Sequence, residues 1–213
     1  MAFGSGVLIS VLAFDLMDEA FTSGGIIASS FGFLAGALLY TGANELLAKF
    51  GARHRKRSES EVRQNEDEED NGLAIAMGAL LDGIPESIAI GLSMLGGTGV
   101  SLVAVIGIFL SNVPEGLSSS VGMKRSGKSK TYIFGLWTGI MIISGVAALA
   151  GYLLFDNVTP EVSAATTALA AGAVLTMIVD TMIPEAFQKT RTATGIISVC
   201  GFLCAFYLSK SLG

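Results

Sequence analysis

Seven long apolar segments follow one another along the chain, and polar breaks separate them. Each segment is close to the ~20 residues that a helix needs to cross the hydrocarbon core of a bilayer. This pattern predicts an all-α polytopic membrane protein, a single transmembrane domain over residues 1–213 with about seven membrane helices. The predicted spans are residues 3–21, 26–48, 72–95, 99–123, 132–154, 162–187 and 193–211.

The composition agrees with a membrane location. Hydrophobic residues make up 51% of the chain and charged residues only 15%, whereas a soluble domain carries roughly a quarter charged residues. The chain also contains 27 glycines, and glycine is more frequent in membrane helices than in soluble ones. The composition therefore favours a chain whose apolar surface faces lipid.

Nearly all Lys and Arg residues lie in the polar breaks that follow the second, fourth and sixth spans. Six fall between residues 49 and 63, four between 124 and 130, and two between 189 and 191, which leaves Lys210 alone near the C-terminus. Cytoplasmic loops carry the excess of Lys and Arg in membrane proteins. We therefore expect these breaks in the cytoplasm, the N-terminus inside, the C-terminus outside and the protein in the cytoplasmic (plasma) membrane.

The charge of the break at residues 49–71 changes from positive to negative along the chain, from the basic run Arg53–Arg57 to the acidic run Glu66–Asp70. Such a stretch has little apolar surface to bury, so it is predicted to be a disordered cytoplasmic loop.

Two short stretches inside the apolar segments resemble each other. Residues 82–86 read Asp-Gly-Ile-Pro-Glu and residues 111–115 read Ser-Asn-Val-Pro-Glu, 29 positions further on. A carboxylate at bilayer depth is costly, and a proline there leaves a backbone carbonyl without its helical donor. Both features occur twice at one register, which indicates that the chain uses them.

The spacing places the polar groups of each stretch together. Asp82 and Glu86 are four residues apart and share a helix face, as do Ser111 and Glu115, and Asn112 borders the second face. If the two spans pack with these faces together, three carboxylates converge near mid-membrane. They cannot all stay ionised there without a cation. The cluster then binds a divalent metal, relays protons or ties helices together through protonated, hydrogen-bonded acids.

A second sequence similarity, which we call the sequence echo, links the first and sixth spans. Residues Asp15–Phe21 resemble residues Asp180–Phe187, which contain one additional residue. In the predicted topology, Asp15 and Glu19 approach the outer end of span one, and Asp180 and Glu185 approach the inner end of span six. Acids at opposite ends suit entry and exit of a cation, and they equally suit simple solvation at the interfaces. Related segments of opposite orientation indicate inverted repeats, which are common in transporters.

The residues of the paired stretches resemble those of the ZIP family of divalent metal transporters. In that family the fourth and fifth membrane helices carry a His-Asn-x-Pro-Glu-Gly type motif, and residues 111–116, Ser-Asn-Val-Pro-Glu-Gly, match it except at the first position. Residues 82–86 keep only its Pro and Glu. The start of the chain, at residues 4–9, and residues 179–186 are similar to the family's second and seventh helices.

The resemblance aligns the seven spans with helices two to eight of the ZIP fold and leaves the first helix without a counterpart. It implies a transporter that imports zinc, iron or manganese as substrate, with no prosthetic group and no nucleic-acid partner, and it leaves a homodimer open. The implied metal ligands are Asp82, Glu86, Ser111, Asn112 and Glu115. All of them offer oxygen, which suits harder ions such as manganese better than zinc.

Other functions stay open at this stage. The missing first helix and the absent histidine ligands also fit a ZIP-derived protein that senses metal or binds a membrane partner without transporting. Buried acids could also serve a proton-coupled carrier. No enzyme is expected, because the chain contains no Gly-x-Gly-Asp protease pattern, no His-Glu-x-x-His zinc motif and no Ser-His pairing. It also lacks a phosphate-binding Gly-x-x-x-x-Gly-Lys-[Ser/Thr] loop, so pumping driven by ATP would need another subunit.

Overall fold

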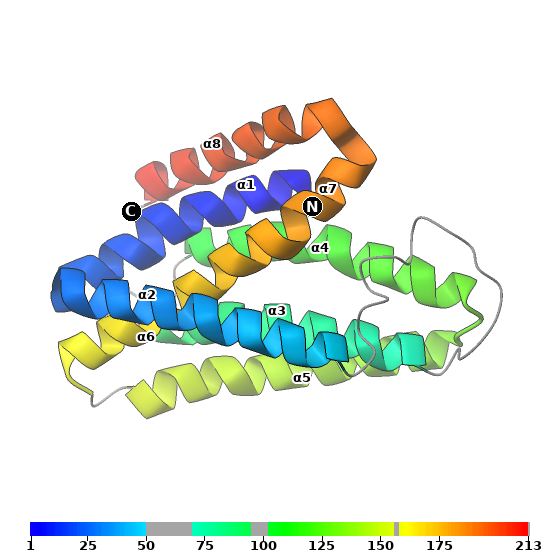
Figure 1. Ribbon diagram of the computed structural model, residues 1–213, viewed down its shortest axis with the longest axis horizontal. Helices are drawn as coiled ribbons and strands as arrows, with labels where there is room; N and C mark the ends of the chain where they lie inside the picture. Colours follow the sequence, from blue (N-terminus) through cyan, green and yellow to red (C-terminus); the bar gives the residue numbers. More distant parts are fainter. Residues whose placement is uncertain (50–69, 95–101, 156–157, 213) are drawn as a thin grey trace.

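The computed structural model describes residues 1–49, 70–94, 102–155 and 158–212, and every element within these ranges is helical (Figure 1). The prediction of an all-α protein is confirmed for this part of the chain. The elements are α1 (Ala2–Val11), η1 (Leu12–Leu16), α2 (Met17–Lys49), α3 (Asp70–Ser93), α4 (Leu102–Arg125), α5 (Lys130–Phe155), α6 (Pro160–Met177), η3 (Ile178–Met182), α7 (Ile183–Thr190), η4 (Arg191–Ala193) and α8 (Thr194–Leu212).

The predicted charged loop is shorter at both ends than expected. Lys49 still belongs to α2, and α3 begins at Asp70 rather than after Asn71. The rest of that loop, residues 50–69, lies outside the described residues, and so does the predicted break at residues 96–98.

Four helical stretches among the described residues are long and apolar enough to cross a membrane. They are Ala2–Leu46, Lys130–Phe155, Pro160–Gln188 and Arg191–Ser211. An integral membrane protein is compatible with these helices, and the number of seven crossings stays a prediction.

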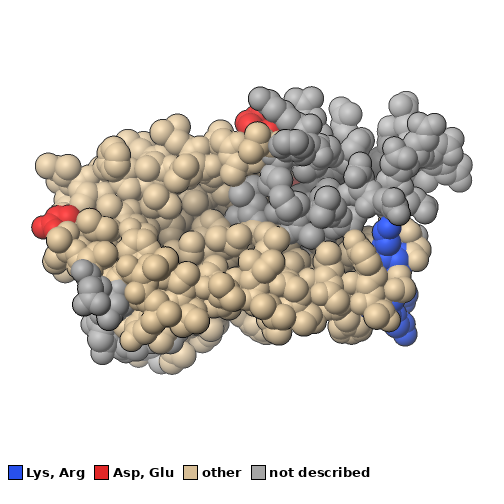
Figure 2. Space-filling model, turned by 90° about the horizontal axis from the view of Figure 1, so that it is seen from below, with Lys and Arg blue, Asp and Glu red and all other residues tan. Residues whose placement is uncertain are grey.

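The outer surface of the bundle supports a membrane location. Large aliphatic and aromatic side chains point outward from several helices: Ile27 is 83% exposed, Phe31 74%, Phe134 73% and Tyr207 72%. Figure 2 shows a side of the bundle on which nearly all described residues are uncharged, with Lys and Arg visible only at one end of the long axis and Asp or Glu at the other end and at the upper edge. A soluble protein rarely exposes such an extensive apolar surface.

The long helix α2 contains two helices that meet at Gly25. Its φ of 73° and ψ of 179° are not helical, although the residues on both sides are. This backbone region is accessible essentially only to glycine. The junction lies inside the predicted break at residues 22–25, so the chain changes direction where the sequence pattern places the end of the first span.

The start of α6 follows the sequence signal for a helix N-terminus. Thr159 is the N-cap in an extended conformation, Pro160 occupies the first turn and Glu161 follows it. The Thr159 carbonyl accepts 3.0 Å hydrogen bonds from the backbone N–H groups of Val162 and Ser163. Proline suits this position because the first N–H groups of a helix have no intrahelical partner.

Glycines bring three pairs of helices into close contact: α1 with α8, α2 with α6, and α3 with α5. At each contact a Cβ atom on the glycine would overlap a carbonyl oxygen of the partner helix. Small residues allow backbones to approach closely, and this packing drives helix association in membranes. The glycines are Gly6 and Gly201 in the first pair, Gly36 and Gly172 in the second, and Gly91 in the third.

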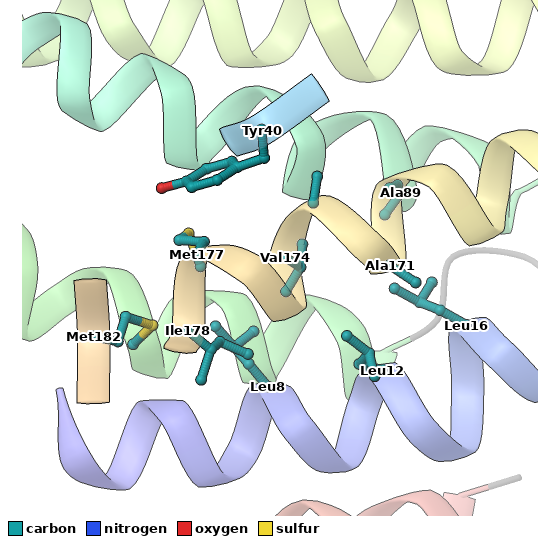
Figure 3. Packing of buried hydrophobic residues seen from close by; sticks show 12 residues of the cluster. Leu8, Leu12, Leu16, Tyr40, Ala89, Ala171, Val174, Met177, Ile178 and Met182 are labelled. Carbon is teal, nitrogen blue, oxygen red and sulfur yellow. The ribbon is translucent and has the colours of Figure 1, made fainter. Parts of the chain in front are cut away.

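The core lies where α1 and α6 cross. Leu8 and Leu12 of α1 and η1 pack against Val174 and Ile178 of α6 and η3, and Tyr40 of α2 closes the other side (Figure 3). More than half of the apolar stretch of α6, 56%, is buried, against 6% for α5. Helix α6 is therefore central and α5 peripheral.

The two segments of the second sequence echo share an unusual backbone. Asp15 lies in the five-residue π-helix η1, and Asp180 lies in the five-residue π-helix η3. Leu16 at the end of η1 and Met182 at the end of η3 lie at opposite ends of the core cluster (Figure 3).

The pairing of the helices follows the same relationship. Helix α1, which precedes Asp15, packs on α8, which follows Asp180. Helix α6, which precedes Asp180, packs on α2, which follows Asp15. This exchange is what two inverted repeats produce, and it adds a structural observation to the sequence echo.

Candidate metal centre

Glu86 is a buried carboxylate in the interior of the bundle. It lies on α3, directly after Pro85, and its side chain is only 2% exposed. Helix α3 continues through the proline, and the Ser87 hydroxyl donates a 2.6 Å hydrogen bond to the Gly83 carbonyl on this turn. The proline is therefore accommodated within one helix that carries Glu86 into the core.

Asn112 joins this carboxylate from the neighbouring helix α4. Its side-chain Nδ2 donates a hydrogen bond of 3.0 Å to Glu86 Oε2. Asn112 itself is exposed on α4, so the pair leads from the surface of one helix to the interior of the bundle. The two Pro-Glu stretches thus lie on helices that are in contact, and one polar residue from each meets the other.

A small pocket adjoins Glu86 and is otherwise lined by aliphatic side chains. Its cavity volume is only about 10 Å³, roughly what a single water molecule needs. The lining comes from α1 and η1, α3, α4 and α6, and consists of Leu8, Val11, Leu12, Leu16, Ala89, Ile108 and Val174 together with Glu86. Glu86 is the one ionisable residue in this lining.

These surroundings determine what the carboxylate can do. An ionised carboxylate among aliphatic side chains loses most of its hydration, and a neutral amide donor does not neutralise its charge. A bound cation or a proton would neutralise it. The amide oxygen of Asn112 is also a suitable ligand for a hard divalent cation, so the pair offers oxygen atoms from two different helices.

The remaining predicted ligands are placed only through their helices. Asp82 belongs to α3, one turn before Glu86, and Ser111 and Glu115 belong to α4, on either side of Asn112. The side chains of these three residues lie outside the described part of the structure. Among the side chains that are described, no group of three or more His, Cys, Asp and Glu residues is arranged to hold a metal ion.

The predicted entry residues lie on the π-helical turn and just after it. Asp15 in η1 is half-buried, and its Oδ1 accepts a 2.9 Å hydrogen bond from the Ser209 hydroxyl of α8. Glu19 is half-buried in the first turn of α2. Both lie in the continuous helical segment formed by η1 and the start of α2, which also contains Leu12 and Leu16 of the pocket beside Glu86.

The predicted exit residues lie on the corresponding turn of the other repeat. Asp180 in η3 and Glu185 in the first turn of α7 are both half-buried. Neither residue is among those that line the pocket beside Glu86. It places them with η3, at the opposite end of the core from η1.

Sequence analysis missed three features of this region. The aliphatic lining of the pocket comes from five elements, of which α3, α4 and α6 are far in the sequence from α1 and η1. The two π-helices have no local sequence signature, although the echo between Asp15 and Asp180 marks their positions. The contact between Asp15 and Ser209 joins residues 194 positions apart, and only the packing of α1 on α8 brings them together.

Comparison with known proteins adds no relative: no protein-family profile matches this chain, and no curated protein matches it.

Proposed function

We propose that this protein transports a divalent metal cation across a membrane, with Glu86 as the central ligand. The observation that carries the proposal is the buried Glu86 carboxylate, which accepts a hydrogen bond from Asn112 of the neighbouring helix inside an apolar bundle. An ionisable residue at membrane depth is costly and usually functional. The matching Pro-Glu stretches on the two contacting helices and their resemblance to the ZIP motif support the same conclusion.

The topology that fits this function has seven crossings, with residues 126–129 inside and the C-terminus outside. Helix α2 then supplies the end of the first crossing and, after Gly25, the second. Metal enters past Asp15 and Glu19, binds at Glu86 with Asn112, and leaves toward Asp180 and Glu185. The two π-helices lie at opposite ends of the core, in keeping with such a path.

The proposed site takes hard cations in preference to soft ones. The residues that the two stretches contribute offer oxygen atoms, and the only histidine of the chain, His54, belongs to the charged loop. Carboxylate and amide oxygens favour manganese, whereas zinc prefers imidazole and thiolate ligands. We therefore propose manganese as a better substrate than zinc.

Uptake of manganese, zinc, iron and cadmium into proteoliposomes tests the function. The wild-type protein is compared with Glu86→Gln, which removes the charge and keeps the shape. Glu45→Gln serves as the control, because Glu45 is an exposed acid near the end of α2. We expect wild-type and Glu45→Gln vesicles to accumulate manganese and Glu86→Gln vesicles to stay at background.

The possible results separate the proposed function from its rivals. If wild-type vesicles take up none of the four ions, the protein is not a transporter of these metals. Metal binding by the purified protein without any flux would instead support a sensor. Wild-type uptake rates in Glu86→Gln would remove Glu86 from the metal path.

A further inference from the structure

The end of the bundle where η1 meets the last turn of α8 holds a lysine beside a half-buried carboxylate. Ser209 donates its hydroxyl hydrogen to Asp15 Oδ1, and the next residue, Lys210, is close enough for its charge to act on the same carboxylate. Asp15 Oδ2 is buried and accepts no hydrogen bond from the described residues. The ammonium group of Lys210 lies 5.9 Å from the centroid of the Phe14 ring.

Aromatic packing fixes the helix that carries this lysine. The Phe14 ring meets Phe206 edge-on at a centroid distance of 5.0 Å and Phe202 at 5.9 Å. The contacts hold the C-terminal half of α8 against η1. A cation over an aromatic face gains electrostatic attraction from the ring. These contacts place Lys210 over the Phe14 ring, next along the helix to the Ser209 that binds Asp15.

Asp15 also has two acidic neighbours. Asp15 interacts electrostatically with both Asp18 and Glu19, and like charges this close repel one another. Of the 13 basic residues in the sequence, 12 lie in the three loops that are predicted to be cytoplasmic. Lys210 is the exception. An acidic surface raises the local concentration of cations, and a fixed ammonium group within it reduces that effect.

The same π-helix connects this acidic end to the Glu86 pocket. Leu12 and Leu16, which line the pocket, are the first and last residues of the five-residue η1, and Asp15 lies between them. Asp15 therefore belongs to the same turn as the residues that border Glu86. π-Helical turns are frequent at functional sites.

We propose that Lys210 is a tethered cation that competes with the incoming metal for Asp15, and that it thereby sets the apparent affinity of the transporter. This inference rests on the proposed function. In the absence of metal the ammonium group compensates the charge of the Asp15 carboxylate, which would otherwise be costly to bury. A divalent ion carries twice that charge and displaces Lys210 from Asp15 on its way to Glu86.

The test is manganese uptake by proteoliposomes as a function of metal concentration and ionic strength. Lys210→Gln removes the competing charge, and Lys210→Arg keeps it. We expect Lys210→Gln to lower the KM for manganese severalfold, because it removes one unit of positive charge that repels a divalent ion approaching Asp15. The maximal rate should stay unchanged, and Lys210→Arg should match the wild type. The difference should shrink at high salt, because mobile ions screen exposed charges.

A double-mutant comparison ties the effect to Asp15. In an Asp15→Asn background, Lys210→Gln should change the KM no further, because the group for which it competes is gone. An unchanged or raised KM in Lys210→Gln, with wild-type uptake intact, overturns this inference and leaves the proposed function standing. Absence of uptake in the wild type overturns both.

Discussion

Asn112 and Glu86 are joined by a 3.0 Å hydrogen bond from the side-chain amide Nδ2 to the carboxylate Oε2, across 26 residues of sequence and two helices. The acceptor is one of the most completely buried side chains of the described structure, and the donor is exposed on α4. This contact connects the two Pro-Glu stretches physically. A substitution of Asn112 therefore tests the role of Glu86 without changing the carboxylate itself.

Asn112→Ala should weaken metal transport without abolishing it. The change removes a donor to a charged acceptor, an interaction worth about 1.5–3 kcal/mol, and it also removes an oxygen from the proposed site. We expect the KM for manganese to rise about tenfold, the equivalent of ~1.4 kcal/mol. The measurement is uptake into proteoliposomes at varied manganese concentrations.

A matched control for this variant lies on the same helix. Leu117→Ala shortens a side chain of α4 that is 63% exposed, so it should leave the KM unchanged. Equal KM values in Asn112→Ala and Leu117→Ala would show that the amide plays no part in metal binding.

Gly172→Ala should destabilise the protein through the contact between α2 and α6. A Cβ at this position would overlap the carbonyl oxygen of Phe33, so the helices must move apart. Overpacking of this kind costs about 1–3 kcal/mol. Thermal unfolding in detergent, followed by circular dichroism, should show a Tm lowered by several degrees.

Gly139→Ala in α5 is the control for that experiment, because a Cβ there meets no atom within 4 Å. Alanine is about 1 kcal/mol more favourable than glycine inside a helix, so this variant should be as stable as the wild type or more so. Similar Tm values for the two variants would mean that α2 and α6 are not in close contact.

Gly25→Ala should destabilise the junction between the two halves of α2. The φ of 73° and ψ of 179° at this residue lie in a region that alanine strongly disfavours, at a cost of about 1–3 kcal/mol. Gly42→Ala, in the same helix and with open space around the new Cβ, should have no such effect. The Tm in detergent measures both. If Gly25→Ala melts at or above the temperature of Gly42→Ala, the helix does not break at Gly25.

Much of the helix order follows from the sequence because its signals are local. The break before α6 is an example, since Thr159 and Pro160 form a helix start without help from distant residues. Gly25 is another, because glycine permits a backbone conformation that ends the first helix. Where the apolar pattern alone determined a boundary, the helix ends differ by a few residues, as at Asp70.

The candidate site was less predictable because it depends on tertiary contacts. The sequence placed Glu86 and Asn112 on helix faces that could meet, and the motif echo supplied the reason to pair them. No pattern in the sequence indicates that Leu8 or Val174 would border Glu86. The partner of Asp15 was equally hidden, since Ser209 is a common residue near the end of the last helix.

The predicted orientation can be tested through two loops at opposite ends of the bundle. The basic residues around Ser126 place the connection between α4 and α5 in the cytoplasm, and Thr159, before α6, should then lie outside. Cys200 and Cys204 are free and exposed, so both are first replaced by serine. Single cysteines are then introduced as Ser126→Cys and Thr159→Cys, both at exposed positions.

A membrane-impermeant maleimide should label Thr159→Cys in intact cells and Ser126→Cys only after permeabilisation. The reverse pattern would invert the topology and turn the proposed entry at Asp15 into an exit. Labelling of both positions in intact cells would place the two loops on one side, which an α5 that crosses the membrane does not allow.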